Sequence, residues 1–162
     1  MTRSPLQILV FPFIKEKDEI LYALFKRKTE KYWQAIAGGG DNNETPIQAA
    51  MREVNEETGI PYDSKYLPLC STATMPVPNV TGDFIWGPDI LLIVERAFGV
   101  EMFNKDLALS DEHSEYAWVN YQKAMELLKW DSNKTALWEL NHRLTNDVDI
   151  NETETVLSTY LP

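Results

Sequence analysis

Three glutamates of this sequence have the spacing that brings side chains together on one face of a helix. Glu53, Glu56 and Glu57 stand at positions i, i+3 and i+4, and residues three and four apart are neighbours on a helix surface. Like charges placed in this way repel each other, and the adjacent Arg52 can pair with one of them. Such a face either remains in water, which is the common case for a charge cluster alone, or binds a cation.

A short helix with well-defined ends would hold these glutamates. Thr45 is a suitable N-cap, Pro46 suits the first helical position, and Gln48 stands where a capping box requires Glu or Gln. Gly59 can supply the left-handed residue that ends a helix. Residues at the spacing i, i+3, i+4, i+7 and i+11 predict a buried stripe, which comprises Ile47, Ala50, Met51, Val54 and Thr58.

The wider spacing around this helix matches the Nudix box. Gly38 is followed after five residues by Glu44, and after seven further residues the segment REVNEETGI begins at Arg52 and ends at Ile60. Every fixed identity and both apolar positions of the box are present, a match that chance produces on the order of once in ten million trials. The sequence resembles the Nudix hydrolases, which implies an α/β fold, an α/β/α sandwich around a mixed β-sheet.

The chemistry of pyrophosphate hydrolysis accounts for such a cluster of carboxylates. A polyanionic pyrophosphate repels hydroxide until its charge is neutralised. Mg²⁺ suits this task, and Mn²⁺ can substitute for it, because hard divalent cations prefer oxygen ligands and bridge carboxylates to substrate phosphates. A bound metal ion also lowers the pKa of an attacking water. The glycines at residues 38–40 would let the backbone turn tightly and approach the metal ion or the phosphates.

The resemblance implies a role for each charged residue of the box. The metal ligands that it implies are Gly38, through its backbone carbonyl, Glu53, Glu56 and Glu57. Glu53 is also a candidate for the general base. Arg52 would orient the cluster through salt bridges, and Glu44 would support the loop before the helix.

Residues outside the box resemble the bacterial dihydroneopterin triphosphate pyrophosphohydrolases. The matching positions are Arg27, Tyr32, Trp33, Gln34, residues 48–51, Glu112, His113, Tyr116, Trp118, Trp130, Ser132 and Asn133. The resemblance implies that Glu112 takes part in catalysis and competes with the box for the role of general base. Arg27 and Trp33 would bind substrate. By residue type alone, Glu112 would be an exposed carboxylate of an acidic loop, and Trp118 and Trp130 are expected to belong to the core.

The order of apolar runs predicts a mixed sheet with helices. Strands are predicted at residues 6–14, 20–27, 33–37, 66–75, 89–98 and 116–119, and further helices at residues 121–129 and 133–144. Ser132 is the expected cap of the last helix, and residues 75–88 are expected to form a loop. Pro12 in the first strand indicates an edge position or a bulge. We interpret residues 1–162 as one domain, in which residues 145–162 form a polar C-terminal tail.

The composition limits the classes of function that this chain can have. A net charge of −10 over 162 residues argues against a nucleic-acid polymer as partner, because surfaces that bind nucleic acids are basic. The single cysteine, Cys70, fits a reducing compartment. The sequence shows neither a signal peptide nor an apolar run of about 18 residues. We therefore expect a cytoplasmic protein without membrane contact, a monomer or homodimer that acts on a small phosphorylated molecule.

Three functions remain open from the sequence. The first is metal-dependent hydrolysis of dihydroneopterin triphosphate to the monophosphate and pyrophosphate, for folate synthesis, which the resemblance outside the box favours. The second is a house-cleaning hydrolase of (deoxy)nucleoside triphosphates or ADP-ribose. The third is a non-catalytic nucleotide sensor. Nudix-like sensors typically lose glutamates of the box, whereas this chain keeps all four of them.

Overall fold

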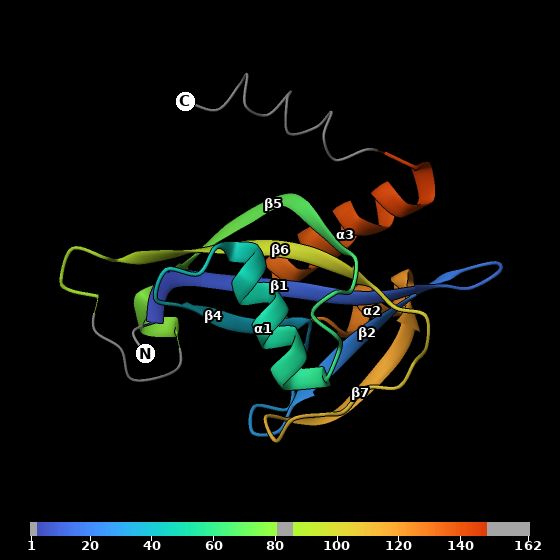
Figure 1. Cartoon of the computed structure of the whole chain (residues 1–162), viewed down its shortest axis with the longest axis horizontal. Coiled ribbons are helices and arrows are strands. Elements are labelled where there is room, and N and C mark those ends of the chain that lie inside the picture. The colour runs from blue at the N-terminus through green and yellow to red at the C-terminus, as the bar shows by residue number, and fades with distance from the viewer. Residues whose placement is uncertain (1–2, 81–85, 149–162) are drawn as a thin grey trace.

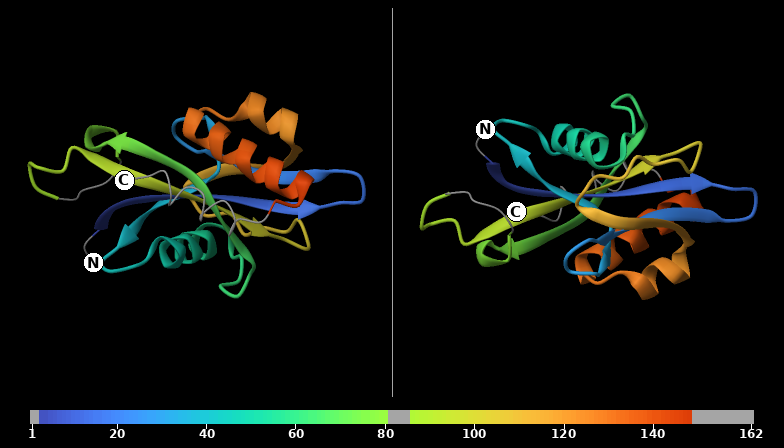
Figure 2. Two further views of the ribbon diagram at one scale, coloured as in Figure 1. Left: turned by 90° about the horizontal axis from the view of Figure 1, so that it is seen from above. Right: turned by 90° about the horizontal axis from the view of Figure 1, so that it is seen from below.

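A mixed seven-stranded sheet separates one helix from two others in the computed structural model, which describes residues 3–80 and 86–148. Helix α1 (Pro46–Thr58) lies on one face of the sheet, and α2 (Tyr121–Leu127) and α3 (Asp131–Asn146) lie on the other. Figures 1 and 2 show this arrangement from three directions. The predicted α/β/α sandwich around a mixed sheet is confirmed.

Strand β1 lies inside the sheet and contacts three other strands. The strands are β1 (Arg3–Lys15), β2 (Ile20–Arg27), β3 (Trp33–Gln34), β4 (Ile36–Asp41), β5 (Tyr66–Pro76), β6 (Leu92–Glu101) and β7 (His113–Asn120). The main order is β3-β2-β1-β6-β5, with β4 beside β1 and β7 beside β2. The pair β1–β6 is parallel and the other pairs are antiparallel. A 3-10 turn (Val77–Asn79) follows β5.

Pro12 does not lie in an edge strand, so the edge position expected from the sequence was wrong. On one side β1 pairs with β6 over its whole middle part, so Pro12 lies in an interior strand. On its other side β1 pairs with β4 as far as Val10 and with β2 from Phe13 onward. The proline, which has no N–H to donate, therefore falls in the interval where β1 changes its partner.

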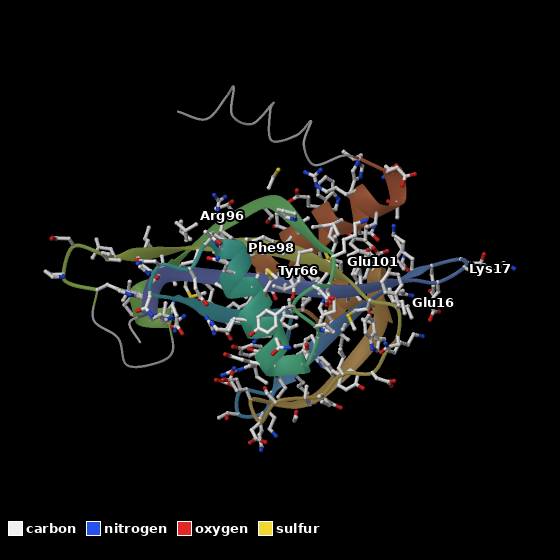
Figure 3. All side chains as sticks on the ribbon, viewed as in Figure 1. Glu16, Lys17, Tyr66, Arg96, Phe98 and Glu101 are labelled. Carbon is white, nitrogen blue, oxygen red and sulfur yellow. The ribbon has the colours of Figure 1, made fainter. Side chains whose placement is uncertain are left out.

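Alternate residues of β1 supply two separate hydrophobic clusters, one on each face of the sheet. Ile8 and Val10 belong to the cluster beneath α1, whereas Leu9 and Phe11 belong to the cluster beneath α2 and α3. Figure 3 marks two aromatic residues of the first cluster, Phe98 and Tyr66, beside α1. Each helix is therefore held by burial of one face, and α1 has a rigid support.

The ends of several elements differ from the prediction. The strand expected at residues 33–37 is divided into β3 and β4, and the glycines of residues 38–40 belong to the extended strand β4. Helix α3 begins at Asp131 and extends to Asn146, so that the first two residues of the expected tail are helical. The rest of that tail, from residue 149 onward, lies outside the described residues. No helix among the described residues is long and apolar enough to cross a membrane.

Candidate active site

The predicted caps of α1 are confirmed. The backbone N–H of Gln48 donates to the Thr45 hydroxyl over 3.4 Å, and the Thr45 N–H donates to the Gln48 side chain over 2.9 Å. Gly59 has φ of 72° in the left-handed region, and its N–H donates to the Asn55 carbonyl over 2.8 Å. These local bonds satisfy backbone groups at both helix ends, so the glutamates between them stand on a well-defined helix.

The buried face of α1 includes one of the catalytic candidates. The buried residues of the helix are Ala49, Ala50, Val54, Glu57 and Thr58. Met51, which was expected in the buried stripe, is only half-buried. Glu57 is 5% exposed, whereas the Glu56 side chain is 57% exposed. The three glutamates therefore share an edge of the helix but differ strongly in their access to water.

Arg52 binds three glutamates of the box at once. Its Nε and Nη2 donate to the two carboxylate oxygens of Glu44 over 2.9 and 3.0 Å. Its Nη1 donates to Glu53 over 2.9 Å and to Glu56 over 3.2 Å, and Nη2 also reaches the Gly39 carbonyl over 2.8 Å. The hydrogen bonds with Arg52 lower the pKa of Glu44. This network fixes the loop before α1 relative to the helix, since a bidentate pair constrains both partners.

The glycines of β4 provide room for charged side chains. Neither Gly38 nor Gly39 has a positive φ, so the tight turn expected at these glycines is not observed. A Cβ atom on Gly38 would overlap the carboxylate of Glu53, and a Cβ atom on Gly39 would overlap the guanidinium of Arg3. The absence of side chains thus allows a carboxylate and a cation to approach neighbouring residues of the β4 backbone.

Glu57 and His113 form a buried polar pair without a hydrogen bond. Oε2 of Glu57 lies 3.8 Å from Nδ1 of His113, and neither atom has a hydrogen-bond partner among the described residues. Burial, together with the charges of Glu53 and Glu112, raises the pKa of Glu57 to about 9. Burial also lowers the pKa of His113, so its ring is neutral at neutral pH. A carboxylate oxygen left without a partner beside other carboxylates is the arrangement that a cation would satisfy.

The loop before β7 brings Glu112 to the C-terminal end of α1. The N–H groups of Ala108 and Ser110 donate to the carbonyls of Thr58 and Glu57 over 2.9 and 3.0 Å. These bonds satisfy two carbonyls at the end of the helix and anchor the loop. The negative charge of Glu112 contributes to the raised pKa of Glu57, although the two residues are far apart in the sequence. The structure therefore brings Glu112 to the box, with an exposed carboxylate.

The metal ligands expected from the sequence do not form a convergent set in this structure. Among residues 3–80 and 86–148, no group of three or more His, Cys, Asp and Glu side chains is arranged to hold a metal ion. Arg52 engages Glu53 and Glu56, while Glu57 is buried beside them. The donor chemistry nevertheless fits a hard divalent cation, since carboxylate oxygens lie close to a glycine-rich strand. The ligand roles of these residues remain predictions.

A cavity of about 360 Å³ opens on the face of the sheet that carries α3. A row of three paired residues lines it, because Glu95 of β6 pairs with Ala73 of β5 on one side and with Gln7 of β1 on the other. Tyr32 and Trp130 also line the cavity and contact each other edge to face, with ring centroids 5.4 Å apart. The volume and the mixture of aromatic and polar groups suit a small-molecule site.

Two arginines link this cavity to acidic residues, Arg3 to Glu53 of the box and Arg27 to Glu112. Arg3 and Arg27 both line it. Arg3 also lies against Gly39 and interacts electrostatically with Glu53. Nη1 of Arg27 donates to Oε2 of Glu112 over 2.9 Å. The cavity and these two carboxylates are therefore linked through the side chains of Arg3 and Arg27.

The cavity contains residues that sequence reasoning misplaced or missed. Trp130 was expected in the core, but it is 45% exposed and lines the cavity. Trp33 does not line it, since it packs against the cluster beneath α2 and α3. Arg3 and Glu95 were not identified as site residues. The signal for Glu95 was present in the sequence, because it is a charged residue within the most apolar strand.

The first turn of α3 is also part of the cavity. Ser132 lies inside the helix rather than at its cap, because α3 begins at Asp131 and has Trp130 as its N-cap. Oδ1 of the buried Asn133 accepts a hydrogen bond of 3.0 Å from the Ala35 N–H, which ties the start of α3 to the link between β3 and β4. The resemblance had marked both Ser132 and Asn133, and the structure places them together at the cavity.

Comparisons with known proteins agree with this fold and with the Nudix box. The family model of the NUDIX domain matches residues 4–138. A dihydroneopterin triphosphate diphosphatase of Escherichia coli is 27% identical over 137 residues, covering 83% of this chain and 91% of that protein. A Listeria monocytogenes structure assigned to the NUDIX hydrolases is 38% identical, with a TM-score of 0.80 over 89% of this chain and 97% of that chain. The E. coli dihydroneopterin triphosphate pyrophosphohydrolase structure shares the fold at 23% identity, with a TM-score of 0.70 over 88% and 99% of the two chains.

Proposed function

This chain belongs to the NUDIX domain family and is a hydrolase of pyrophosphate bonds, and from this premise we propose that it converts dihydroneopterin triphosphate into dihydroneopterin monophosphate and pyrophosphate. The observation that carries the proposal is the cavity with aromatic and amide side chains, which two of its arginines link to Glu53 of the box and to Glu112. The relative of E. coli that carries the name of this activity supports it. We propose the cytoplasm as its site of action.

The three parts of the site correspond to the three parts of such a substrate. The cavity has the size for a bicyclic ring, and Tyr32 and Trp130 offer aromatic surfaces for it. Arg3 and Arg27 stand where the triphosphate would pass toward α1, and guanidinium groups bind phosphates in bidentate fashion. The bond to be cleaved would then lie at the glutamates.

Mg²⁺ is the proposed metal, since Nudix hydrolases generally use divalent metal ions. Glu53, Glu56, Glu57 and the carbonyl of Gly38 would hold it. When bound, such an ion neutralises phosphate charge and lowers the pKa of a coordinated water. Arg52 contributes by orienting Glu53 and Glu56 through its hydrogen bonds.

Glu112 is the proposed general base. Its side chain is 60% exposed, so it can reach a water molecule, whereas the Glu53 side chain is only 16% exposed. Two hydrogen bonds hold Glu112 in place. Its backbone carbonyl accepts one of 3.0 Å from the Lys28 N–H, and its carboxylate accepts one from Arg27. A base that is held in place and open to water can remove a proton from an attacking water.

A substrate comparison tests the proposal. The purified protein with Mg²⁺ should hydrolyse dihydroneopterin triphosphate with a kcat/KM at least about tenfold above the values for dATP, dCTP and ADP-ribose. GTP belongs in the same series because its base resembles a pterin. A preference for ADP-ribose, or equal rates with all nucleotides, would favour the house-cleaning function instead. Binding without turnover of any of these compounds would favour a nucleotide sensor.

A further inference from the structure

Glu95 is an acidic residue inside a strand that is otherwise apolar on its buried face. In β6 the exposed residues Leu92, Val94 and Arg96 alternate with buried ones, and Glu95 stands in the buried series. It is 6% exposed and lines the cavity. Burial raises its pKa, which a hydrogen bond from Ser132 partly offsets.

The hydrogen bond from Ser132 uses only part of the acceptor capacity of this carboxylate. An ionised carboxylate can accept about four hydrogen bonds, and burying a charge without partners is costly. If β6 only filled the core, an apolar residue at this position would avoid the cost of burying a charge. The cavity is where further donors can reach the carboxylate, and a ligand can supply them.

The neighbours of Glu95 define which ligand edge would fit. Gln7 pairs with Glu95 in adjacent strands, so the two side chains stand side by side in the cavity. Oε1 of Gln7 accepts a hydrogen bond of 2.7 Å from Arg3, which leaves the amide NH₂ of Gln7 to donate. The pair therefore presents two acceptors followed by one donor.

We propose that Glu95 and Gln7 recognise the 2-amino-4-oxopyrimidine edge that pterin and guanine share. Its amino group and adjacent ring N–H donate to the two oxygens of Glu95, and its carbonyl accepts from the amide of Gln7. Tyr32 and Trp130 provide the aromatic surfaces of the same cavity. The inference rests on the proposed function and names the group that selects its substrate class.

A binding experiment without metal tests this recognition apart from catalysis. Pterin and lumazine differ because lumazine carries an oxo group in place of the 2-amino group. In EDTA, calorimetry should show pterin binding at least about tenfold more tightly than lumazine, because the loss of a paired donor leaves a buried carboxylate unsatisfied. Equal affinities of the wild-type protein for pterin and lumazine would overturn the proposal, independently of the results with variants.

The variant Glu95→Gln then assigns the preference to this residue. It should reduce the pterin-to-lumazine ratio to within about threefold, while Glu115→Gln, an exposed acidic residue of β7, should retain it. Thermal unfolding of each variant checks that it is folded. A folded Glu95→Gln variant that keeps the full preference would overturn the proposal.

Kinetics with Mg²⁺ show whether the recognised ring belongs to a pterin or to a guanine nucleotide. They also test this inference separately from the proposed function. GTP should have at least about a tenfold higher kcat/KM than ITP, which lacks the 2-amino group, and Glu95→Gln should remove this difference mainly through KM. If dihydroneopterin triphosphate were not hydrolysed while GTP still exceeded ITP, the proposed substrate would be wrong and the recognition by Glu95 would stand. Equal values for GTP and ITP in the wild-type enzyme would contradict the recognition alone.

Discussion

Nη1 of Arg27, which lines the cavity, donates a hydrogen bond of 2.9 Å to Oε2 of Glu112, the carboxylate that lies near the C-terminal end of α1. The register of β2 and β7 makes the contact, because Arg27 pairs with His113, the residue after Glu112. The arginine proposed to bind substrate and the proposed general base are thus positioned by the same pair of strands.

Removing Glu112 should slow the chemical step more than it weakens binding. Glu112→Ala is expected to lower kcat by roughly 10²–10⁴-fold and to change substrate affinity by only a few-fold, as for loss of a general base. Glu115→Ala is the matched control, because Glu115 is an exposed glutamate of β7 that pairs with Lys26. Steady-state kinetics measure both. A change of less than about threefold for Glu112→Ala would return the role of base to Glu53.

Removing the Arg27 side chain should affect substrate binding. Arg27→Ala is expected to raise KM by about 10–100-fold, because it removes a phosphate-binding guanidinium from the cavity. Arg27→Lys should recover only part of this loss, since lysine has no bidentate geometry. Arg96→Ala, in an exposed residue of β6, is the control. An unchanged KM in Arg27→Ala would place the phosphates elsewhere.

Glu57 should make the metal-free protein less stable as the pH rises. Its pKa is about 9 in the folded state, compared with about 4.3 in an unfolded chain. Between these values the folded state binds more protons than the unfolded state, so the free energy of unfolding falls with increasing pH. Urea unfolding in EDTA at pH 5 and pH 8 should show this decrease, and Glu57→Gln should abolish most of it.

The same variant separates stability from activity. At pH 8 in EDTA, Glu57→Gln should be more stable than the wild type by about 1–3 kcal/mol, whereas the exposed control Glu56→Gln should change by less than about 0.5 kcal/mol. With Mg²⁺, Glu57→Gln should lose at least about 10²-fold in kcat. A destabilised variant, or one with the wild-type rate, would contradict the assignment of Glu57.

Glu139 should be important for the attachment of α3 to β5. Its carboxylate accepts from the N–H groups of Cys70 and Ser71 over 2.8 and 2.7 Å, where the register of β5 shifts, and from the buried Arg143. Glu139→Ala should lower the free energy of unfolding by about 2–4 kcal/mol, because it leaves two strand N–H groups and a buried cation without this partner. Glu126→Ala, in an exposed pair with Lys123, should cost less than about 1 kcal/mol.

Local signals in the sequence were sufficient for α1 and insufficient for its surroundings. Thr45, Gln48 and Gly59 act within one helix, so their roles were predictable from spacing and were confirmed. The burial of Glu57 depends on the loop before β7 and on His113, which are distant in the sequence. Spacing within the helix therefore could not predict that Glu57 is buried and Glu56 is exposed.

The cavity was difficult to predict for the same reason. Trp130 and Glu95 line the same cavity only because the start of α3 lies beside β6 and its neighbours. A tryptophan is more often buried than exposed in a site, and an acid in an apolar strand can be explained only when its partners are known. Pro12 is a similar case, because the change of partner along β1 depends on how β4 and β2 are arranged.

The most direct test of the proposed activity is the stoichiometry of the products formed from dihydroneopterin triphosphate. With Mg²⁺, the wild-type protein should release one pyrophosphate and one dihydroneopterin monophosphate for each substrate consumed, and excess EDTA should abolish the reaction. Release of orthophosphate in place of pyrophosphate, or turnover that continues undiminished in EDTA, would contradict the account.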